Sequence, residues 1–104
     1  MSGALLGTTI IDICRDLPGS YACMLLGDMG AEVIKIEPVD GDPARSDPTF
    51  HLWNRGRKSL AVDIRSTEGR DILARLIARS DVLVETYLVR ETRELGVDYD
   101  TVGP

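Results

Sequence analysis

The sequence predicts an α/β fold of the doubly wound class, in which helices flank an open parallel sheet of about four strands. Three observations predict it: short runs rich in β-branched residues recur along the chain, apolar residues at helical spacing separate two pairs of these runs, and glycine or proline interrupts the chain between them. A strand, a helix and a second strand form a βαβ unit, whose right-handed crossover makes the two strands parallel. Two such units in succession give this class of sheet.

The first unit begins with Thr8–Ile13 (TTIIDI), which is predicted to be a strand. Pro18 and the glycine after it then predict a turn. From Ser20 to Met29 the apolar residues recur at helical spacing, and Gly30 suits the left-handed position that ends a helix. The segment Ala31–Ile36 (AEVIKI) is predicted to be the second strand.

The second unit starts at Ser59–Ile64 (SLAVDI), another predicted strand. Thr67–Arg79 follows as a helix with one apolar face, and Asp71 and Arg75 form an i,i+4 pair on its outer side. Val82–Glu85 is predicted to be the fourth strand. The second unit therefore repeats the order of the first.

A long segment, Glu37–Asn54, separates the two units and carries three prolines and several aspartates. This composition predicts a loop without regular structure. Long loops in compact domains are often functional, so we expect a site component or a strap over a partner subunit. Near the end of the chain, Glu91–Leu95 is expected to form one short helical turn.

Composition and charge narrow the class of protein. The 104 residues have room for one domain, placed at residues 1–104, and 43% apolar with 28% charged residues is ordinary for a globular protein. The formal charge of -5 argues against a general affinity for nucleic acid, which needs many cations to neutralise phosphates. The chain begins without a basic segment or a long apolar stretch, so we expect no signal peptide, no membrane span and a cytoplasmic location.

No catalytic residue and no metal site are predicted. Cys14 and Cys23 lie in apolar runs without the spacing of metal ligands, and we expect both to be reduced core residues. The single His51 cannot support a metal site by itself, and none of the six serines has a histidine at a suggestive position. The carboxylates are numerous, but none is marked by its setting as a nucleophile.

Ligands of doubly wound sheets bind beyond the carboxyl ends of the strands, which here fall at residues 14–20, 37–38 and 85–87. The turn Arg15–Ser20 places the N–H groups of a helix start there, an arrangement that binds anions. Gly19 stands alone, with the bulky Leu17 and Tyr21 where a dinucleotide fingerprint needs glycine. An enzyme that uses NAD or FAD is therefore disfavoured.

Two further features each allow two interpretations. Glu37, at the end of the second strand, can bind a ribose hydroxyl or be a solvated carboxylate. The run Asn54–Ser59 (NRGRKS) gathers three cations in an acidic chain, which suits a phosphorylated ligand but also an incidental, solvated loop. This run precedes its strand, so it reaches the carboxyl edge only by folding over it. From the residues alone, the chain is an α/β domain that binds an anion.

Four segments in order resemble the opening of the family III CoA-transferases: IIDICRDLPGSYACMLLGDMGAEVIKIEP, GDPAR, WNRGRKSLAVDIRSTEGRDIL and SDVLVETY. This family includes formyl-CoA and carnitine CoA-transferases, and α-methylacyl-CoA racemases share the pattern. The resemblance runs from about Gly7 to Gly96. It implies a Rossmann-like sheet that binds the adenine and phosphate end of CoA, in a homodimer of two interlocked chains. It also implies that the chain is only the N-terminal segment of the family's large domain.

By position, the resemblance assigns twelve residues to the CoA site. They are Arg15, Leu17, Pro18, Gly19, Glu37, Pro38, Asn54, Arg55, Arg57, Lys58, Thr86 and Tyr87. Coenzyme A and its thioesters are then substrates, and no tightly bound cofactor is implied. The chain departs from the family at Thr86–Tyr87, where N-F is usual, and at Arg57–Lys58, where K-R is common. The first departure leaves the CoA contact at Thr86 open.

The family's transferases use an aspartate that attacks the acyl-CoA thioester and forms a mixed anhydride. By the resemblance this aspartate lies beyond Pro104, so no carboxylate here inherits the role, and we expect the truncated chain to be inactive without a complementing chain. Three alternatives stay open: a fragment of a racemase, a non-catalytic remnant that binds CoA or completes a partner chain, and, least favoured, a dinucleotide oxidoreductase. Any affinity for CoA is expected to depend on the loop Asn54–Lys58, so that replacing Arg57 and Lys58 together with alanine lowers it.

Overall fold

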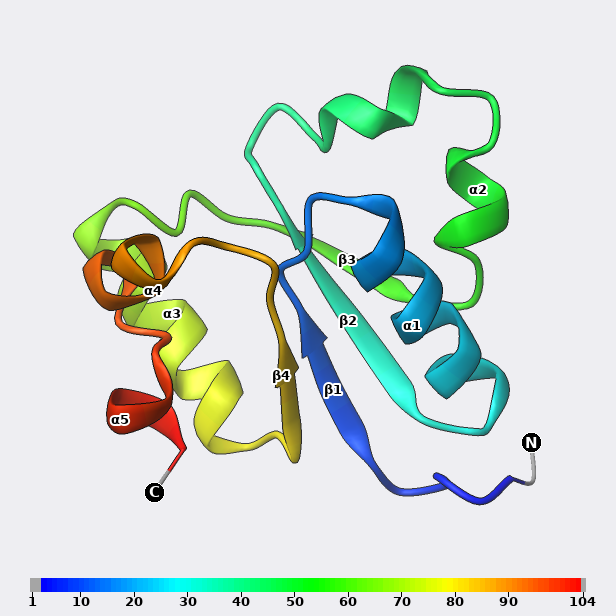
Figure 1. Ribbon diagram of the computed structural model, residues 1–104, viewed down its shortest axis with the longest axis horizontal. Coiled ribbons are helices and arrows are strands. Elements are labelled where there is room, and N and C mark those ends of the chain that lie inside the picture. Colours follow the sequence, from blue (N-terminus) through cyan, green and yellow to red (C-terminus); the bar gives the residue numbers. More distant parts are fainter. Residues whose placement is uncertain (1–2, 104) are drawn as a thin grey trace.

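The computed structural model describes residues 3–103 and shows a four-stranded parallel sheet flanked by helices (Figure 1). The strands are β1 (Thr9–Asp12), β2 (Glu32–Glu37), β3 (Lys58–Ala61) and β4 (Val82–Val84). They lie in the order β3-β2-β1-β4, and each neighbouring pair is parallel. The predicted doubly wound class and the four strands are confirmed. The third strand ends three residues early because Asp63 turns the chain, accepting hydrogen bonds from the N–H groups of Arg65 (3.0 Å) and Ser66 (3.1 Å).

Helix α1 (Leu17–Asp28) starts earlier than predicted. The sequence analysis expected a turn at Pro18, but this proline lies in the first helical turn, where its missing N–H costs nothing. The carboxylate of Asp16 caps the helix by accepting the N–H of Gly19 at 3.1 Å. Gly30 follows the helix at φ 103°, the left-handed conformation predicted for it.

The second unit contains α3 (Thr67–Ala78), which Ser66 caps by accepting the N–H of Gly69 at 2.9 Å. The predicted surface pair of Asp71 and Arg75 is present at 2.9 Å. After β4, helix α4 (Val89–Leu95) is longer than the predicted single turn, and α5 (Tyr99–Val102) was not predicted.

The expectation that residues 37–54 lack regular structure is wrong. The segment contains a 3-10 turn, η1 (Pro43–Ser46), and a short helix, α2 (Phe50–Trp53). Asp47 organises the approach to α2, because its carboxylate accepts both the N–H and the hydroxyl of Thr49 at 2.8 Å. Figure 1 shows the segment leaving the carboxyl end of β2 and returning through α2 beside α1.

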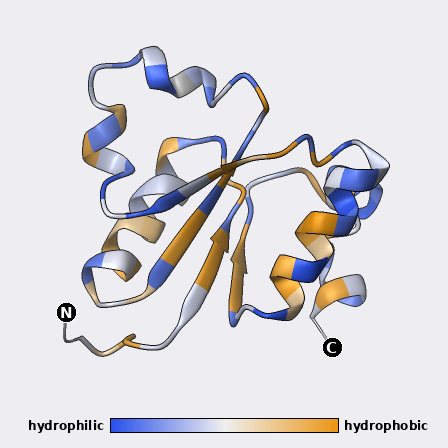
Figure 2. Ribbon diagram, turned by 180° about the vertical axis from the view of Figure 1, so that it is seen from behind, coloured by the Kyte–Doolittle hydropathy of each residue, from blue (hydrophilic) through white to orange (hydrophobic). Residues whose placement is uncertain are grey.

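The alternation of side chains along the strands divides the core into two layers. Ile10 of β1 packs with Cys23 of α1 on one face of the sheet, while Ile11 packs with Leu73 of α3 on the other. Figure 2 shows apolar residues concentrated on the central strands of the sheet. The strand β3 is exposed along its whole length.

Cys14 and Cys23 are both buried and unbridged, as predicted. The pKa of the Cys14 thiol is raised by its hydrogen bond with the Cys23 thiol, by burial and by the charge of Asp12. A buried, protonated thiol reacts poorly because the thiolate is the nucleophile. We therefore expect a thiol reagent to label neither cysteine in the native protein and both after unfolding. Rapid labelling of Cys14 in the native protein would contradict this burial.

Candidate functional site

The structure joins the carboxyl ends of β1 and β4, where the direction of strand order reverses. The N–H of Arg15 donates to the hydroxyl of Thr86 at 3.4 Å, and its Nε donates to the hydroxyl of Tyr87 at 3.1 Å. Three of the predicted site residues are thus held together. Their location is the switch point at which doubly wound sheets bind ligands.

A cleft of about 430 Å³ opens beside these contacts. It is lined by Arg15, Pro38, Asp42, Pro43, Ile64, Arg65 and Tyr87. The lining residues thus come from the segments that follow the carboxyl ends of all four strands. Arg15 and Arg65 give it two cations, and the Arg65 side chain is 58% exposed, with Glu91 at 3.6 Å. Arg65 was not among the predicted site residues, although it directly follows a predicted strand and so falls at the carboxyl edge.

A smaller hollow of about 140 Å³ lies at the start of α1 and shares Arg15 and Asp42 with the cleft. The predicted residues Leu17 and Asn54 line it, together with Phe50 and Trp53 of α2. The side-chain N–H of Asn54 donates to the carbonyl of Phe50 at 3.0 Å, while its Oδ1 is buried without a hydrogen-bond partner among the described residues. This hollow joins the basic cleft to an apolar wall.

Gly19 and Pro18 have structural reasons to be where they are. A Cβ at Gly19 would lie 2.4 Å from the Sγ of Cys14, so only glycine fits between α1 and the end of β1. Pro18 is exposed in the first turn of α1. Neither residue lines the cleft, and their assignment to the CoA site stays a prediction.

Glu37 is fully engaged inside the protein. Its carboxylate accepts two hydrogen bonds from Arg45, both at 2.7 Å, one from the N–H of Asp42 at 3.0 Å and one from the hydroxyl of Ser59. The Arg45 guanidinium, followed by these other donors, lowers the pKa of Glu37 to about 2. These contacts shape the loop after β2, and the predicted contact between Glu37 and a ribose remains untested.

Lys35 makes a second buried ion pair at this edge. Its ammonium lies 3.1 Å from the carboxylate of Asp42, and the two side chains are 2% and 7% exposed. The same ammonium donates to the carbonyl of Cys14 at 3.5 Å. Lys35 therefore links the end of β1 to the loop that walls the cleft.

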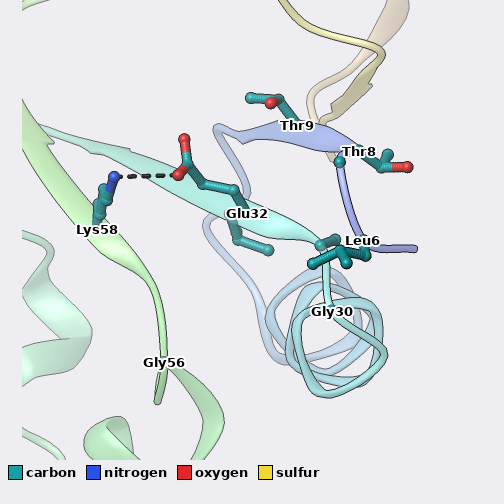
Figure 3. Close-up of a pocket in the computed structure, with 10 residues that line it drawn as sticks. Leu6, Thr8, Thr9, Gly30, Glu32, Gly56 and Lys58 are labelled. Atoms are coloured by element: carbon teal, nitrogen blue, oxygen red, sulfur yellow. Dashed lines mark hydrogen bonds and ion pairs between the residues drawn. The ribbon is translucent and has the colours of Figure 1, made fainter. Parts of the chain in front are cut away.

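The structure separates the three cations of the predicted basic loop. Arg55 pairs with Asp28 at the end of α1, at 2.7 Å, and Lys58 pairs with Glu32 at 3.0 Å. Figure 3 shows the Lys58 pair beside a hollow at the amino edge of the sheet, opposite to the cleft. Arg57 is buried and pairs with Asp12. The loop therefore does not present its charges together.

One buried cluster has the donor atoms of a metal site. The side-chain donor atoms of Asp12, Cys14 and Cys23 lie within 4.8 Å of one another. The carboxylate of Asp12, however, is already paired with the Arg57 guanidinium. It also accepts a hydrogen bond from the N–H of Cys14 at 2.8 Å. The raised pKa of Cys14 also disfavours the thiolate that a metal needs. Arg57 thus occupies the position of a cation in this cluster.

The fold is that of a doubly wound α/β domain with a cleft at the carboxyl edge of its sheet. A family model for CoA-transferase family III matches residues 5–103, and the chain belongs to that family. Among its curated relatives is the succinyl-CoA:glutarate CoA-transferase of Mus musculus, 42% identical over 92% of this chain and 24% of the relative. The succinyl-CoA:mesaconate CoA-transferase of Haloarcula hispanica is 34% identical over 96% of this chain and 28% of the relative. The resemblance seen in the sequence is confirmed.

Solved structures agree with this assignment. A CAIB/BAIF family protein from Brucella suis superposes with a TM-score of 0.91 at 32% identity, covering 98% of this chain and 30% of that one. The protein Rv3272 from M. tuberculosis gives a TM-score of 0.92 at 33% identity, covering 97% and 29%. The chain spans about a quarter of the length of the curated relatives named above. Within the described residues, no helix has the length and apolar character needed to cross a membrane.

Neighbouring cations in the basic loop should differ in their effect on stability. Replacing Arg57 with Met leaves Asp12 buried without its partner, so we expect the free energy of unfolding to fall by about 3–5 kcal/mol. Lys58→Met removes only an exposed ion pair and should change it little. Urea unfolding of both variants measures this difference. Equal losses would contradict the assignment of Arg57 to the interior.

The ion pair and hydrogen bonds of the Glu37 carboxylate predict that the stability of the protein depends on pH. Its pKa of about 2 lies below the ordinary value of 4.5, so its contribution to stability is fully present above pH 4.5 and is lost as the pH falls through 2. Glu37→Gln should therefore be less stable than the parent near neutral pH, with a difference that shrinks between pH 4.5 and 2. Glu32→Gln, at an exposed position, should show almost no such trend in urea unfolding. A difference in the free energy of unfolding between Glu37→Gln and the parent that stays constant with pH would contradict the lowered pKa of Glu37.

Proposed function

We propose that this chain is the CoA-binding N-terminal segment of a CoA-transferase that moves CoA between carboxylic acids. The observation that carries the proposal is the basic cleft at the carboxyl edge, in a chain that belongs to CoA-transferase family III. The relatives named above are themselves named as CoA-transferases, which favours transfer over the isomerase alternative.

The cleft suits the nucleotide end of CoA. That end carries a pyrophosphate and a further phosphate, and a guanidinium binds phosphate through two parallel hydrogen bonds. Arg15, in the turn after β1, and Arg65, in the turn after β3, both line the cleft, and Tyr87 adds an aromatic wall. The thioester end of CoA would then extend toward the smaller hollow at α1. CoA and acyl-CoA act here as substrates, and we propose no tightly bound cofactor.

The chemical step is proposed from the family resemblance. An aspartate oxygen attacks the thioester carbonyl carbon, the carbon–sulfur bond breaks, and CoA leaves as a thiolate while a mixed anhydride forms. The thiolate then attacks the aspartyl carbonyl carbon of this anhydride, the carbon–oxygen bond breaks, and the donor acid leaves as a carboxylate while CoA stays on the aspartate as a thioester. The acceptor carboxylate attacks this thioester, and the same two steps in reverse give the new acyl-CoA and the free aspartate.

We assign that nucleophile to none of the carboxylates in this chain, because the resemblance places the family's aspartate beyond Pro104. The buried carboxylates Asp12, Glu37 and Asp42 are each held in an ion pair. A complementing chain that carries the rest of the family's large domain would supply the nucleophilic aspartate.

The proposed site predicts which arginines control CoA binding. Arg65→Gln and Arg15→Gln should each weaken CoA binding, measured by calorimetry, by about twofold to fivefold, because each removes one partly exposed phosphate contact. Arg75→Gln, on the outer face of α3, is the matched control and should have no effect. Salt should weaken binding to the parent chain by screening these contacts. If neither cleft variant changes the affinity of a chain that binds CoA, the site lies elsewhere.

A further inference from the structure

Arg57 joins three segments at the carboxyl edge of the sheet. Its guanidinium pairs with Asp12, the last residue of β1. It also donates to the carbonyl of Ser20 in α1, at 2.8 Å, and to the carbonyl of Trp53 at the end of α2, at 2.9 Å. A single side chain thus fixes β1, α1 and α2 relative to one another.

The contact with Asp12 extends to the cleft. While one carboxylate oxygen of Asp12 binds Arg57, the other accepts the N–H of Cys14 at 2.8 Å and bends the chain there. Arg15 is the next residue, and it lines both the cleft and the smaller hollow. A shift of Arg57 would therefore move the turn that carries Arg15.

The Arg57 side chain exposes almost no surface that could contact a phosphate. Its side chain is 3% exposed, both terminal nitrogens are engaged inside the protein, and its Nε is buried without a partner among the described residues. Lysine keeps the charge at this position but has no planar fork that could reach Asp12 and two carbonyls in fixed directions. Geometry, rather than charge alone, is what Arg57 supplies.

We propose that Arg57 is a positioning residue: it fixes the turn Arg15–Ser20 and α2 for ligand binding without touching the ligand. The part of this inference that concerns CoA rests on the proposed function. The part that concerns the turn does not, because it follows from the contacts of Arg57 alone.

The first experiment uses no ligand. Hydrogen exchange followed by mass spectrometry compares the parent chain with Arg57→Lys, and Lys58→Arg is the matched control at the neighbouring exposed cation. We expect amides in residues 15–24 and 50–57 to exchange at least about fivefold faster in Arg57→Lys, with α3 unchanged, because the hydrogen bonds to Ser20 and Trp53 are lost. Unchanged exchange in residues 15–24 would overturn the inference.

The second experiment separates positioning from direct contact. CoA binding is measured at low and high salt for the parent, Arg57→Lys, Arg65→Gln and the double variant named below. A positioning residue lowers the affinity while leaving its salt dependence unchanged, whereas loss of a phosphate contact, as expected for Arg65→Gln, reduces the salt dependence. We expect Arg57→Lys, which keeps the charge, to bind about fivefold more weakly. We also expect the double variant Asp12→Asn, Arg57→Gln, which removes the cation at residue 57, to bind more weakly with the salt dependence of the parent. Unchanged affinity, or a reduced salt dependence of the double variant, would overturn the role of Arg57.

Failure of Arg57→Lys to fold and failure of the parent chain to bind CoA would each leave the role of Arg57 testable. If Arg57→Lys does not fold, the double variant Asp12→Asn, Arg57→Gln removes both buried charges at constant net charge and is measured in the same way. If the parent chain does not bind CoA, the proposed function of the isolated chain fails, while the exchange experiment still decides whether Arg57 holds the turn.

Discussion

The carboxyl edge of this domain depends on the buried ion pair between Asp12 and Arg57. Both side chains are almost fully removed from water, so each charge needs the other to offset its loss of hydration. Bringing Asp12 and Arg57 together requires three features of the local structure. The chain must turn at Cys14, α1 must present the carbonyl of Ser20, and the segment after β2 must return past α1 before β3 begins. The long loop is therefore tied to the sheet at both ends, which explains why it contains ordered turns.

Two further ion pairs complete the edge and set its electrostatics. Lys35 neutralises Asp42, and Arg45 neutralises Glu37, so the buried carboxylates at this end of the sheet each have a cationic partner. In a chain of net charge -5, unpaired carboxylates there would repel an anionic ligand. With these charges compensated, Arg15 and Arg65 can give the cleft a positive potential. The two ion pairs thus support the proposed anion binding without contacting the anion.

Sequence periodicity was sufficient to predict the sheet, since β-branched runs and one helical face are local properties. The start of α1 was misplaced because Pro18 is a breaker inside a helix but favourable in its first turn, and only the Asp16 cap distinguishes the two. The separation of the three cations in the basic loop could not be predicted for a different reason. A sequence shows how many charges a segment has but not their partners, and Asp12 lies 45 positions from Arg57. Arg65 could have been found by following the predicted third strand to its carboxyl end.

The structure shows what contacts Thr86 and Tyr87 make where the family pattern has asparagine and phenylalanine. The amide of an asparagine can donate and accept, and its replacement by threonine left the contact at this position open. In the structure the Thr86 hydroxyl accepts the N–H of Arg15, while the Tyr87 hydroxyl accepts its side-chain Nε. Threonine therefore still holds the turn after β1 through its oxygen, and tyrosine adds a contact that phenylalanine cannot make. These two hydroxyls link the turn after β1 to the segment after β4, so they position Arg15 from the β4 side, as Arg57 does from the side of α1.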